Sequence, residues 1–397
     1  MKRHSHAVEP ATRPQRQMLR LFYAGAGFLV TAVTASAFLV STVARRVVTP
    51  ARKRAQETDV LALNAVEGTI TLGRNPDTAL PGRYGLWFGP DDRYLQLGPI
   101  VAQDASTVTR TLDTPVDELA GLPEAGPATF SGWYYSRPEE LGVDWHDVTV
   151  ETPVGPAPAW LFSTGAESGR WVIAVHGRGT TRSECLRAVP ALTEAGCTTL
   201  LMSYRNDGDA PPSDDGLYGL GDTEWEDVDA AIAFAAANGA TSVVLMGWSM
   251  GGAISLQTSL RAKHSDLISG IILESAVVDW GSVLDYQADA ERIPVFVRRA
   301  AIAVISNGWG RYLTGLKTVV NFAALDMVSR AGELSKPMLV LHSDDDGFVP
   351  SDAARALAES RSDLVRFVPF RTARHTKLWN YDEARWSSAI RDWLTGR

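Results

Sequence analysis

The sequence has few of the residues that build disulfides or metal sites. Only 2 cysteines and 7 histidines occur among 397 residues. Cys185 and Cys197 flank a predicted helix of about a dozen residues, which separates their Cα atoms by roughly 15 Å or more, whereas a disulfide needs less than about 7 Å. No Cys/His grouping has zinc-site spacing, and no Gly-x-x-x-x-Gly-Lys-Ser/Thr phosphate loop occurs. We therefore expect two free thiols, no metal and no cofactor.

Positive charge is not in excess either. The 38 Lys and Arg residues are outnumbered by 46 Asp and Glu residues, which gives a formal net charge of -8. A surface that binds nucleic acid is basic, so this composition argues against a nucleic-acid partner. The composition is otherwise that of an ordinary globular protein, and it indicates no oligomeric state.

One long stretch lacks charged residues altogether. Residues 21–44 contain none, and a helix of about 24 residues rises roughly 36 Å, which is enough to span a bilayer. The alternative is a cleaved signal peptide that ends at Ala35-Ser36-Ala37, but the apolar run continues beyond this point. We predict a single-pass N-terminal anchor in the lipid bilayer at residues 21–44, after a basic tail of residues 1–20. Basic residues flank the run on both sides, so the side of the membrane on which the main domain lies stays undecided.

The segment of residues 55–140 has the pattern of short strands. Runs at 68–72, 83–88 and 94–97 have β-type composition, and Pro-, Gly-, Asn- and Asp-containing turns separate them. We expect a small β-rich, membrane-proximal segment whose last part, from about residue 113, is a linker. No residue in this segment suggests a particular chemistry.

From residue 141 to 397 the pattern changes to strands that alternate with helices, which is typical of a mostly parallel sheet covered on both faces. A Pro153-Val154-Gly155-Pro156 turn joins the first two strands, so these two are expected to form an antiparallel hairpin. The long stretch before the seventh strand suggests a helical cap at residues 280–325. The eight predicted strands are 146–151, 158–163, 171–175, 198–203, 242–247, 269–274, 337–342 and 364–369.

The main candidate for chemistry is Gly247-Trp248-Ser249-Met250-Gly251-Gly252. An apolar strand precedes it and a helical run follows it, as in a nucleophile elbow, where glycines relieve crowding around a strained serine. The alternative is a glycine-lined turn in which the serine has no catalytic role.

A serine nucleophile needs a base and a group that orients this base, both at the carboxyl ends of strands. Of the histidines, His375 fits best, because it follows the last strand and precedes the final helix. The acid is expected among Asp344, Asp345 and Asp346, and position alone does not choose between them. Asp279, beyond the sixth strand, is the reserve.

The stabiliser of a developing oxyanion is expected in the glycine-rich turn that begins at His176. Glycines let backbone N–H groups approach a ligand closely. We predict one donor at Gly177 or Arg178 and the other at Met250, the residue after the nucleophile. The Arg178 side chain either faces solvent or lines the substrate pocket.

These motifs together resemble the α/β-hydrolase superfamily over residues 145–397. The run His342-Ser343-Asp344-Asp345-Asp346-Gly347-Phe348-Val349-Pro350 is similar to the acid loop of that superfamily, and this resemblance selects Asp346 as the acid. The order Ser249, Asp346, His375 is also the order of that fold. The segment 201–227 resembles membrane-anchored bacterial members whose activity is unassigned.

The resemblance implies a serine hydrolase that cleaves a carboxylic ester, or a related acyl bond, of an apolar substrate through an acyl-enzyme on Ser249. A propeller-free aminoacyl-peptidase or amidase with the same triad is the enzymatic alternative, and a non-catalytic ligand-binding membrane protein is the alternative of another class. The aromatic residues expected to line the substrate pocket are Trp248, Trp280, Tyr286 and Trp309.

Overall fold

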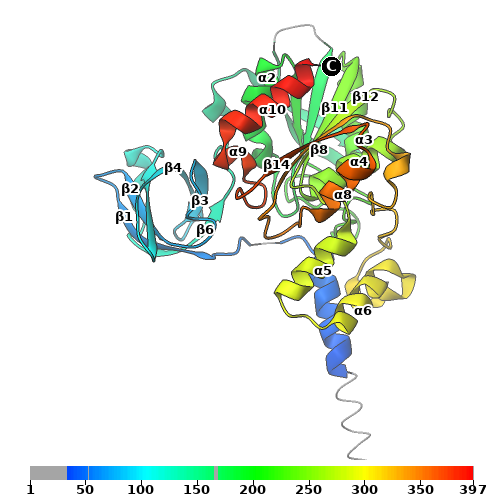
Figure 1. Cartoon of the computed structure of the whole chain (residues 1–397), viewed down its shortest axis with the longest axis horizontal. Coiled ribbons are helices and arrows are strands. Elements are labelled where there is room, and N and C mark those ends of the chain that lie inside the picture. Colours follow the sequence, from blue (N-terminus) through cyan, green and yellow to red (C-terminus); the bar gives the residue numbers. More distant parts are fainter. Residues whose placement is uncertain (1–33, 52, 165–168, 397) are drawn as a thin grey trace, which may run out of the picture.

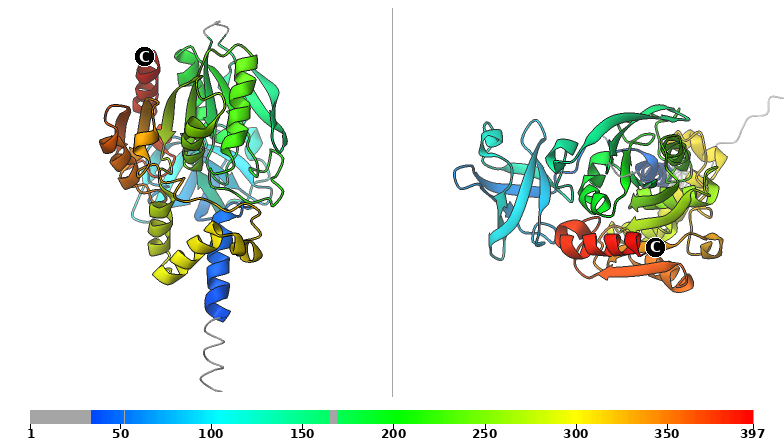
Figure 2. Two further views of the ribbon diagram at one scale, coloured as in Figure 1. Left: turned by 90° about the vertical axis from the view of Figure 1, so that its right-hand side faces the viewer. Right: turned by 90° about the horizontal axis from the view of Figure 1, so that it is seen from above.

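The computed structural model describes residues 34–51, 53–164 and 169–396. A small barrel lies beside a larger main domain, and a helix of residues 34–48 projects from the main domain (Figure 1). We call this helix the N-terminal helix. In the left view of Figure 2 this helix lies at the lower end of the molecule, and in the right view, from above, the barrel lies to one side of the main domain.

The predicted β-rich segment is a closed six-stranded barrel with the strand order β1-β2-β5-β4-β3-β6. Its core consists of inward-facing apolar side chains such as Ile70, Leu86 and Phe88. The barrel closes where β1 pairs antiparallel with β6, with Thr58 opposite Ala128. This corrects the prediction of a linker from about residue 113, because β6 is itself a strand of the barrel. The strands are β1 (Thr58–Asn64), β2 (Thr69–Gly73), β3 (Tyr84–Phe88), β4 (Arg93–Gln103), β5 (Thr107–Leu112) and β6 (Gly126–Ser131).

All eight strands predicted for the main domain are present, and they form one sheet in the order β14-β13-β12-β11-β9-β10-β8-β7. The predicted hairpin is confirmed, because the first two strands pair antiparallel from Trp145 opposite Phe162 to Thr152 opposite Gly155. The strands are β7 (Trp145–Thr152), β8 (Gly155–Phe162), β9 (Arg170–Val175), β10 (Thr198–Met202), β11 (Ser242–Trp248), β12 (Ile268–Glu274), β13 (Met338–Ser343) and β14 (Val365–Phe370).

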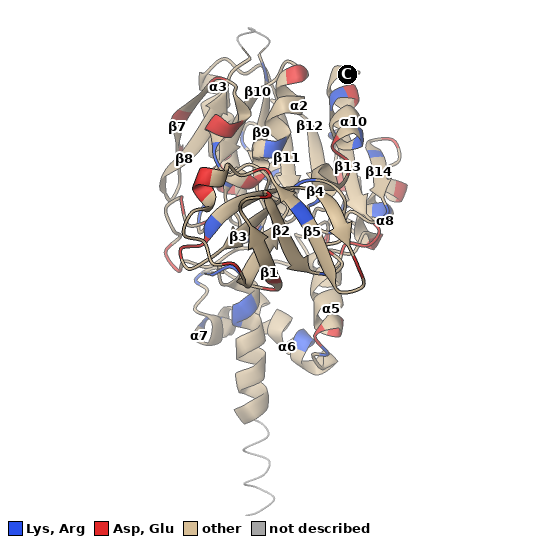
Figure 3. Ribbon diagram, turned by 90° about the vertical axis from the view of Figure 1, so that its left-hand side faces the viewer, with Lys and Arg blue, Asp and Glu red and all other residues tan. Residues whose placement is uncertain are grey.

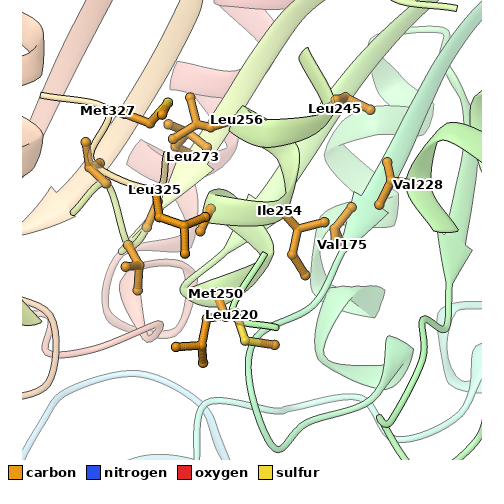
Figure 4. Close-up of a cluster of buried hydrophobic side chains, with 14 of the residues drawn as sticks. Val175, Leu220, Val228, Leu245, Met250, Ile254, Leu256, Leu273, Leu325 and Met327 are labelled. Atoms are coloured by element: carbon orange, nitrogen blue, oxygen red, sulfur yellow. The ribbon is translucent and has the colours of Figure 1, made fainter. Parts of the chain in front are cut away.

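Helices cover both faces of this sheet, as predicted. Alternate residues of β9 point to opposite sides, so Ile173 belongs to one apolar core and Val172 to the other. One core contains side chains of α3 (Trp225–Ala237), α4 (Met250–Arg261) and α8 (Asp352–Ser360), and the other contains those of α2 (Val189–Glu194) and α10 (Glu383–Thr395). Figure 4 shows part of the first core, where Ile254 of α4 lies among apolar side chains of the sheet and of neighbouring segments.

The predicted cap region contains three helices on the same side as the first core. They are α5 (Trp280–Ala290), α6 (Val295–Ser306) and the short α7 (Arg311–Thr314). In Figures 1 and 2, α5 and α6 lie beside the N-terminal helix below the sheet. The cap helices therefore lie beside a helix from the N-terminal part of the chain.

Most of the predicted bilayer-spanning segment, residues 21–33, lies outside the described residues. In its last part, Val40 and Ala44 are buried in the protein core together with Val48. The Ser41 hydroxyl also donates a hydrogen bond to the carbonyl oxygen of Leu313 in α7, over 3.2 Å. Among the described residues, no helix is both long enough and apolar enough to cross a membrane.

Acidic and basic residues are interspersed over the barrel and the main domain (Figure 3). The described part of the N-terminal helix contains only Arg45 and Arg46 as charged residues, and both lie near its C-terminal end. This helix therefore presents an uncharged surface from residue 34 to residue 44.

Candidate active site

Ser249 lies at a sharp turn between β11 and α4. Its φ of 51° and ψ of -118° are unusual for a residue with a side chain, and such a conformation persists only where the surroundings enforce it. Neighbouring glycines allow the turn, because a Cβ at Gly247 would lie 2.3 Å from the carbonyl oxygen of Gly251, and one at Gly251 would lie 2.1 Å from that of Val175. The predicted elbow geometry is therefore present, and it holds the serine above the ends of the strands.

The side chains of Ser249, His375 and Asp346 form one hydrogen-bonded series. The Ser249 Oγ lies 3.1 Å from His375 Nε2, and His375 Nδ1 lies 2.8 Å from Asp346 Oδ2. A carboxylate only accepts, so Nδ1–H donates to Asp346 and Nε2 is left to accept the Ser249 hydroxyl. Both distances lie within the range of about 2.6–3.2 Å expected between a nucleophile, its base and the group that orients the base.

Asp346 is the most enclosed of the three neighbouring aspartates. Its Oδ1 accepts from the backbone N–H groups of Phe348, at 2.9 Å, and Val349, at 2.8 Å. Burial alone would raise the pKa of Asp346, but the charge of His375 and the hydrogen bonds of His342 and His375 outweigh it and lower this pKa below its ordinary value. The carboxylate is therefore ionised at neutral pH, as an acceptor for His375 must be.

The other two aspartates of the loop have different partners. Asp344 is exposed and pairs with Arg355. Asp345 Oδ1 accepts from the Arg374 N–H at 2.9 Å and from the Ser343 hydroxyl at 2.6 Å. The structure thus brings Asp346 to His375, while Asp345 holds the backbone just before it. The reserve acid, Asp279, caps the N-terminus of α5 and does not take part.

The loop of His375 is held in an unusual backbone conformation. The residues on either side, Arg374 and Thr376, have φ values of 61° and 49°. The Ser275 hydroxyl accepts from the Thr376 N–H at 3.1 Å. From the barrel, Asp77 Oδ1 approaches Lys377 Nζ to 3.2 Å. Because partners on both sides fix the loop, the position of the imidazole depends on long-range contacts.

The glycine-rich turn after β9 lies directly against the nucleophile, but it corrects one predicted oxyanion donor. A Cβ at Gly177 would lie 3.3 Å from Ser249 Cβ. The Gly177 N–H, however, donates to Glu184 Oε2 at 2.8 Å, so it is not free to bind an oxyanion. The remaining predicted donors are the N–H groups of Arg178 and of Met250, the first residue of α4. The first N–H groups of a helix have no partner within it, which makes the Met250 N–H available to an anion.

A buried charged network lies beneath this turn. Glu274 Oε2 accepts from the indole N–H groups of Trp248, at 2.7 Å, and Trp386, at 2.8 Å. Arg187 lies between Glu184 and Glu274, with Nη2 at 3.9 Å and 3.8 Å from their nearest oxygens. Burial raises the pKa of Glu274, and the nearby Arg187 charge opposes this rise. Glu184, Arg187 and Glu274 do not stand out in the sequence, because nothing in the chain marks a buried charged residue in advance.

The Arg178 side chain does not face bulk solvent. Its Nη2 donates to the carbonyl oxygens of Arg46, at 2.7 Å, and Thr49, at 2.9 Å. Burial lowers the pKa of Arg178, yet an arginine stays charged at any physiological pH. A cation at the last carbonyls of a helix is stabilising, so Arg178 holds the C-terminal end of the N-terminal helix beside the triad.

A family model agrees with this geometry. The model described as the alpha/beta hydrolase family matches residues 172–387, which is more than half of the chain. The chain belongs to the alpha/beta hydrolase family. A model described as a domain of unknown function matches residues 59–129, within the barrel. No curated protein matches this alpha/beta hydrolase in sequence.

Solved structures agree with the fold of this hydrolase. An esterase of Pyrococcus furiosus is 16% identical, with a TM-score of 0.51 over 66% of this chain and 94% of its own. An esterase of Thermogutta terrifontis, 22% identical, has a TM-score of 0.45 over 63% of this chain and 98% of its own. The esterase RhEst1 of Rhodococcus sp. ECU1013 is 19% identical, with a TM-score of 0.45 over 63% of this chain and 98% of its own. Only the first of these structures has a TM-score above 0.5. Because its sequence identity is low, it supports the fold alone.

Of the four aromatic residues predicted to line the substrate pocket of the hydrolase, one lines a cavity of the cap. Trp280 lines a cavity between α5, α6 and the N-terminal helix, and its indole N–H donates to the Leu220 carbonyl oxygen at 2.7 Å. Trp248 does not line this cavity, because it is fully buried in the core on the opposite face of the sheet. Tyr286 and Trp309 are exposed on the cap and do not line it either. Phe348, which the sequence did not single out, lines the cavity, and its ring centroid lies 5.2 Å from that of His375.

Proposed function

We propose that this alpha/beta hydrolase cleaves a carboxylic ester of an apolar substrate through an acyl-enzyme on Ser249. The observation that carries the proposal is the series of two hydrogen bonds from Ser249 Oγ through His375 to Asp346 Oδ2. The printed name of the structural neighbour from Pyrococcus furiosus, an esterase, is the reason for proposing an ester rather than a peptide bond. The apolar lining of the cavity beside Phe348 favours an apolar substrate.

The first half of the reaction forms the acyl-enzyme. His375 Nε2 takes the Ser249 proton as Oγ attacks the ester carbonyl carbon, and Asp346 stabilises the imidazolium that results. The carbonyl oxygen becomes an oxyanion, for which the N–H groups of Arg178 and Met250 are the donors. The imidazolium then returns the proton to the leaving alkoxide as the C–O bond breaks, so an alcohol departs and the acyl group stays on Ser249.

The second half releases the acid. A water molecule gives its proton to His375 Nε2 and attacks the acyl carbon, and the imidazolium protonates Ser249 Oγ as the acyl–enzyme bond breaks. This restores the serine and yields a carboxylic acid. Every proton is passed by His375, so the reaction needs no further acid or base.

The test is hydrolysis of p-nitrophenyl butyrate by the full chain and by Ser249→Ala. Loss of the nucleophile is expected to lower kcat by at least about 10³-fold. Ser259→Ala is the matched control, because Ser259 lies on the same helix α4 and its hydroxyl donates to the Leu256 carbonyl oxygen. An enzyme that cleaves aminoacyl-p-nitroanilides but not the ester would instead be a peptidase, and equal rates for wild type and Ser249→Ala would exclude the proposed nucleophile.

We also propose that the chain is attached to a lipid bilayer through the uncharged run that begins at Leu21 and continues into the N-terminal helix. Phe38 is exposed on this helix, and the neighbouring cap exposes Phe296, Trp309 and Tyr312. Aromatic residues are typical of the membrane–water interface. On this basis the full chain is expected to sediment with membranes after a carbonate wash and to need detergent for release. Release by carbonate alone would contradict the attachment.

A further inference from the structure

The catalytic groups do not account for a cavity between the N-terminal helix and the cap. Its volume is about 370 Å³, which lies toward the lower end of the range of about 300–1,000 Å³ for ligand sites. Three helices form it, namely α5, α6 and the N-terminal helix. It is therefore a site to which the N-terminal region contributes directly.

The walls of this cavity are mainly hydrocarbon. The N-terminal helix contributes Leu39, Val43 and Val47, and the facing side of α6 contributes Ile302 and Ile305. An occupant would thus contact aliphatic side chains from both sides. This lining fits an apolar occupant.

Three polar interactions at the cavity wall are already satisfied, whereas the Nε of Arg178 is buried without a hydrogen-bond partner. Arg46 and Glu291 form an ion pair at 2.7 Å. Arg298 Nε pairs with Asp285 at 2.9 Å, and Gln287 donates to the Phe348 carbonyl oxygen at 2.7 Å. None of these three interactions offers an unsatisfied group to a charged ligand.

Two residues that line the cavity neighbour the triad, which itself does not line it. Phe348 lines it and packs against His375, with 5.2 Å between ring centroids. Arg178 also lines it and directly follows Gly177, which packs against Ser249. Two lining residues thus neighbour residues of the triad, and a chain bound in the cavity would lie against Phe348, which packs on the catalytic imidazole.

The helices that form the cavity also expose apolar residues to solvent. Leu39 is both exposed and part of the lining, and the adjacent Phe38 is almost fully exposed. On α6, Val295 and Phe296 are exposed as well. An elongated hydrocarbon that extends from the cavity along these helices would meet further apolar side chains.

We propose that this cavity binds the long acyl chain of the ester substrate and that the N-terminal helix is part of the substrate site. This inference rests on the proposed ester hydrolysis and adds the substrate class, an ester of a long-chain fatty acid. It also explains why Arg178 fastens the N-terminal helix beside the oxyanion donors, since the register of this helix sets the shape of the acyl site.

The first test measures chain-length preference with the full-length wild type in one detergent. The ratio of kcat/KM for p-nitrophenyl decanoate to that for the butyrate is expected to be at least about 10, because each buried methylene contributes up to about fourfold. A ratio near 1, with Ser249-dependent hydrolysis of the butyrate intact, overturns the acyl-site inference and leaves the proposed function standing. Absence of any Ser249-dependent hydrolysis overturns both.

The second test fills the cavity from each wall in turn. Val43→Trp and Ile302→Trp are each expected to lower the decanoate-to-butyrate ratio at least about 10-fold, since an indole takes the space of several methylenes. The matched control is Ala37→Trp, because Ala37 is exposed on the same helix and does not line the cavity; it is expected to keep the wild-type ratio. Labelling by a short fluorophosphonate verifies that each variant is folded. An unchanged ratio in a labelled Val43→Trp or Ile302→Trp overturns the inference, and the wild-type ratio decides it even where neither variant folds.

Discussion

The Nη2 atom of Arg178 lies 2.7 Å from the carbonyl oxygen of Arg46 and 2.9 Å from that of Thr49. The same residue follows Gly177, which packs against Ser249. One side chain thus connects the turn at the nucleophile to the end of the N-terminal helix. The position of this helix and the geometry of the proposed oxyanion donors are therefore coupled.

Replacing Arg178 by Met is expected to destabilise the protein by about 1.5–3 kcal/mol, the usual contribution of a hydrogen bond to a charged group. The measurement is the free energy of unfolding in urea. Arg46→Met is the control, because the Arg46–Glu291 pair is largely exposed and such pairs contribute only about 0–1 kcal/mol. Equal losses in the two variants would show that Arg178 does not hold the helix.

Replacing Glu184 by Ala is expected to lower kcat about 10-fold or more with a smaller effect on KM. This carboxylate accepts from the Gly177 N–H at 2.8 Å and from the Thr180 hydroxyl at 2.9 Å, so its loss frees the turn that carries the Arg178 N–H. Loss of a complete oxyanion donor costs about 10²–10³ in kcat, which sets the upper limit. Glu184→Gln keeps an accepting oxygen and is expected to recover part of the rate. A change in KM alone would contradict this positioning role.

The three neighbouring aspartates are expected to differ sharply when each is replaced by Asn. Asp346→Asn is expected to lower kcat by about 10³–10⁴-fold, because the amide no longer selects the correct tautomer of His375. Asp345→Asn is expected to have an intermediate effect, since Asp345 holds the Arg374 N–H beside His375. Asp344→Asn is expected to be near wild type, because Asp344 is exposed. Any other order of the three rates would refute the assignment.

The lowered pKa of Asp346 also predicts how stability depends on pH. Burial opposes the shift, but His375 and His342 outweigh it, so the pKa in the folded state lies below that in the unfolded state. The carboxylate therefore stabilises the fold fully above its unfolded pKa of about 3.9, and this contribution is lost as the pH falls through the folded-state pKa. The difference in unfolding midpoint between wild type and Asp346→Asn is expected to shrink as the pH is lowered below about 4. If the difference in unfolding midpoint widened at low pH, the pKa of Asp346 would be raised, not lowered, in the folded state.

Much of the main domain could be predicted from the sequence because its strands are buried on both faces. Such strands are continuous apolar runs, and in an open α/β sheet the reactive residues follow strand ends. Ser249 and His375 were found in this way. Choosing Asp346 over its neighbours required either the resemblance or the structure, because only the fold shows which carboxylate meets the imidazole.

The features that the sequence did not predict depend on contacts between distant residues. Closure of the barrel requires Thr58 to pair with Ala128, and no local pattern records this. The sequence does not predict the role of Glu184, because this role depends on a hydrogen bond that its carboxylate accepts from the Gly177 N–H. The prediction that Trp248 lines the pocket is wrong, although the alternation of side chains along the strand already indicates which face Trp248 occupies. Met246 and Trp248 share one face of β11, and that face is opposite to the cap.

The most direct test of the central claim is covalent labelling of Ser249 by a fluorophosphonate, read by intact-protein mass and by the modified peptide. The wild-type chain is expected to gain one adduct, on Ser249, and Ser249→Ala is expected to gain none. His375→Ala is expected to label far more slowly, because the serine would lack its base. A folded wild-type chain that gains no adduct, or one that carries it on another residue, would contradict the account.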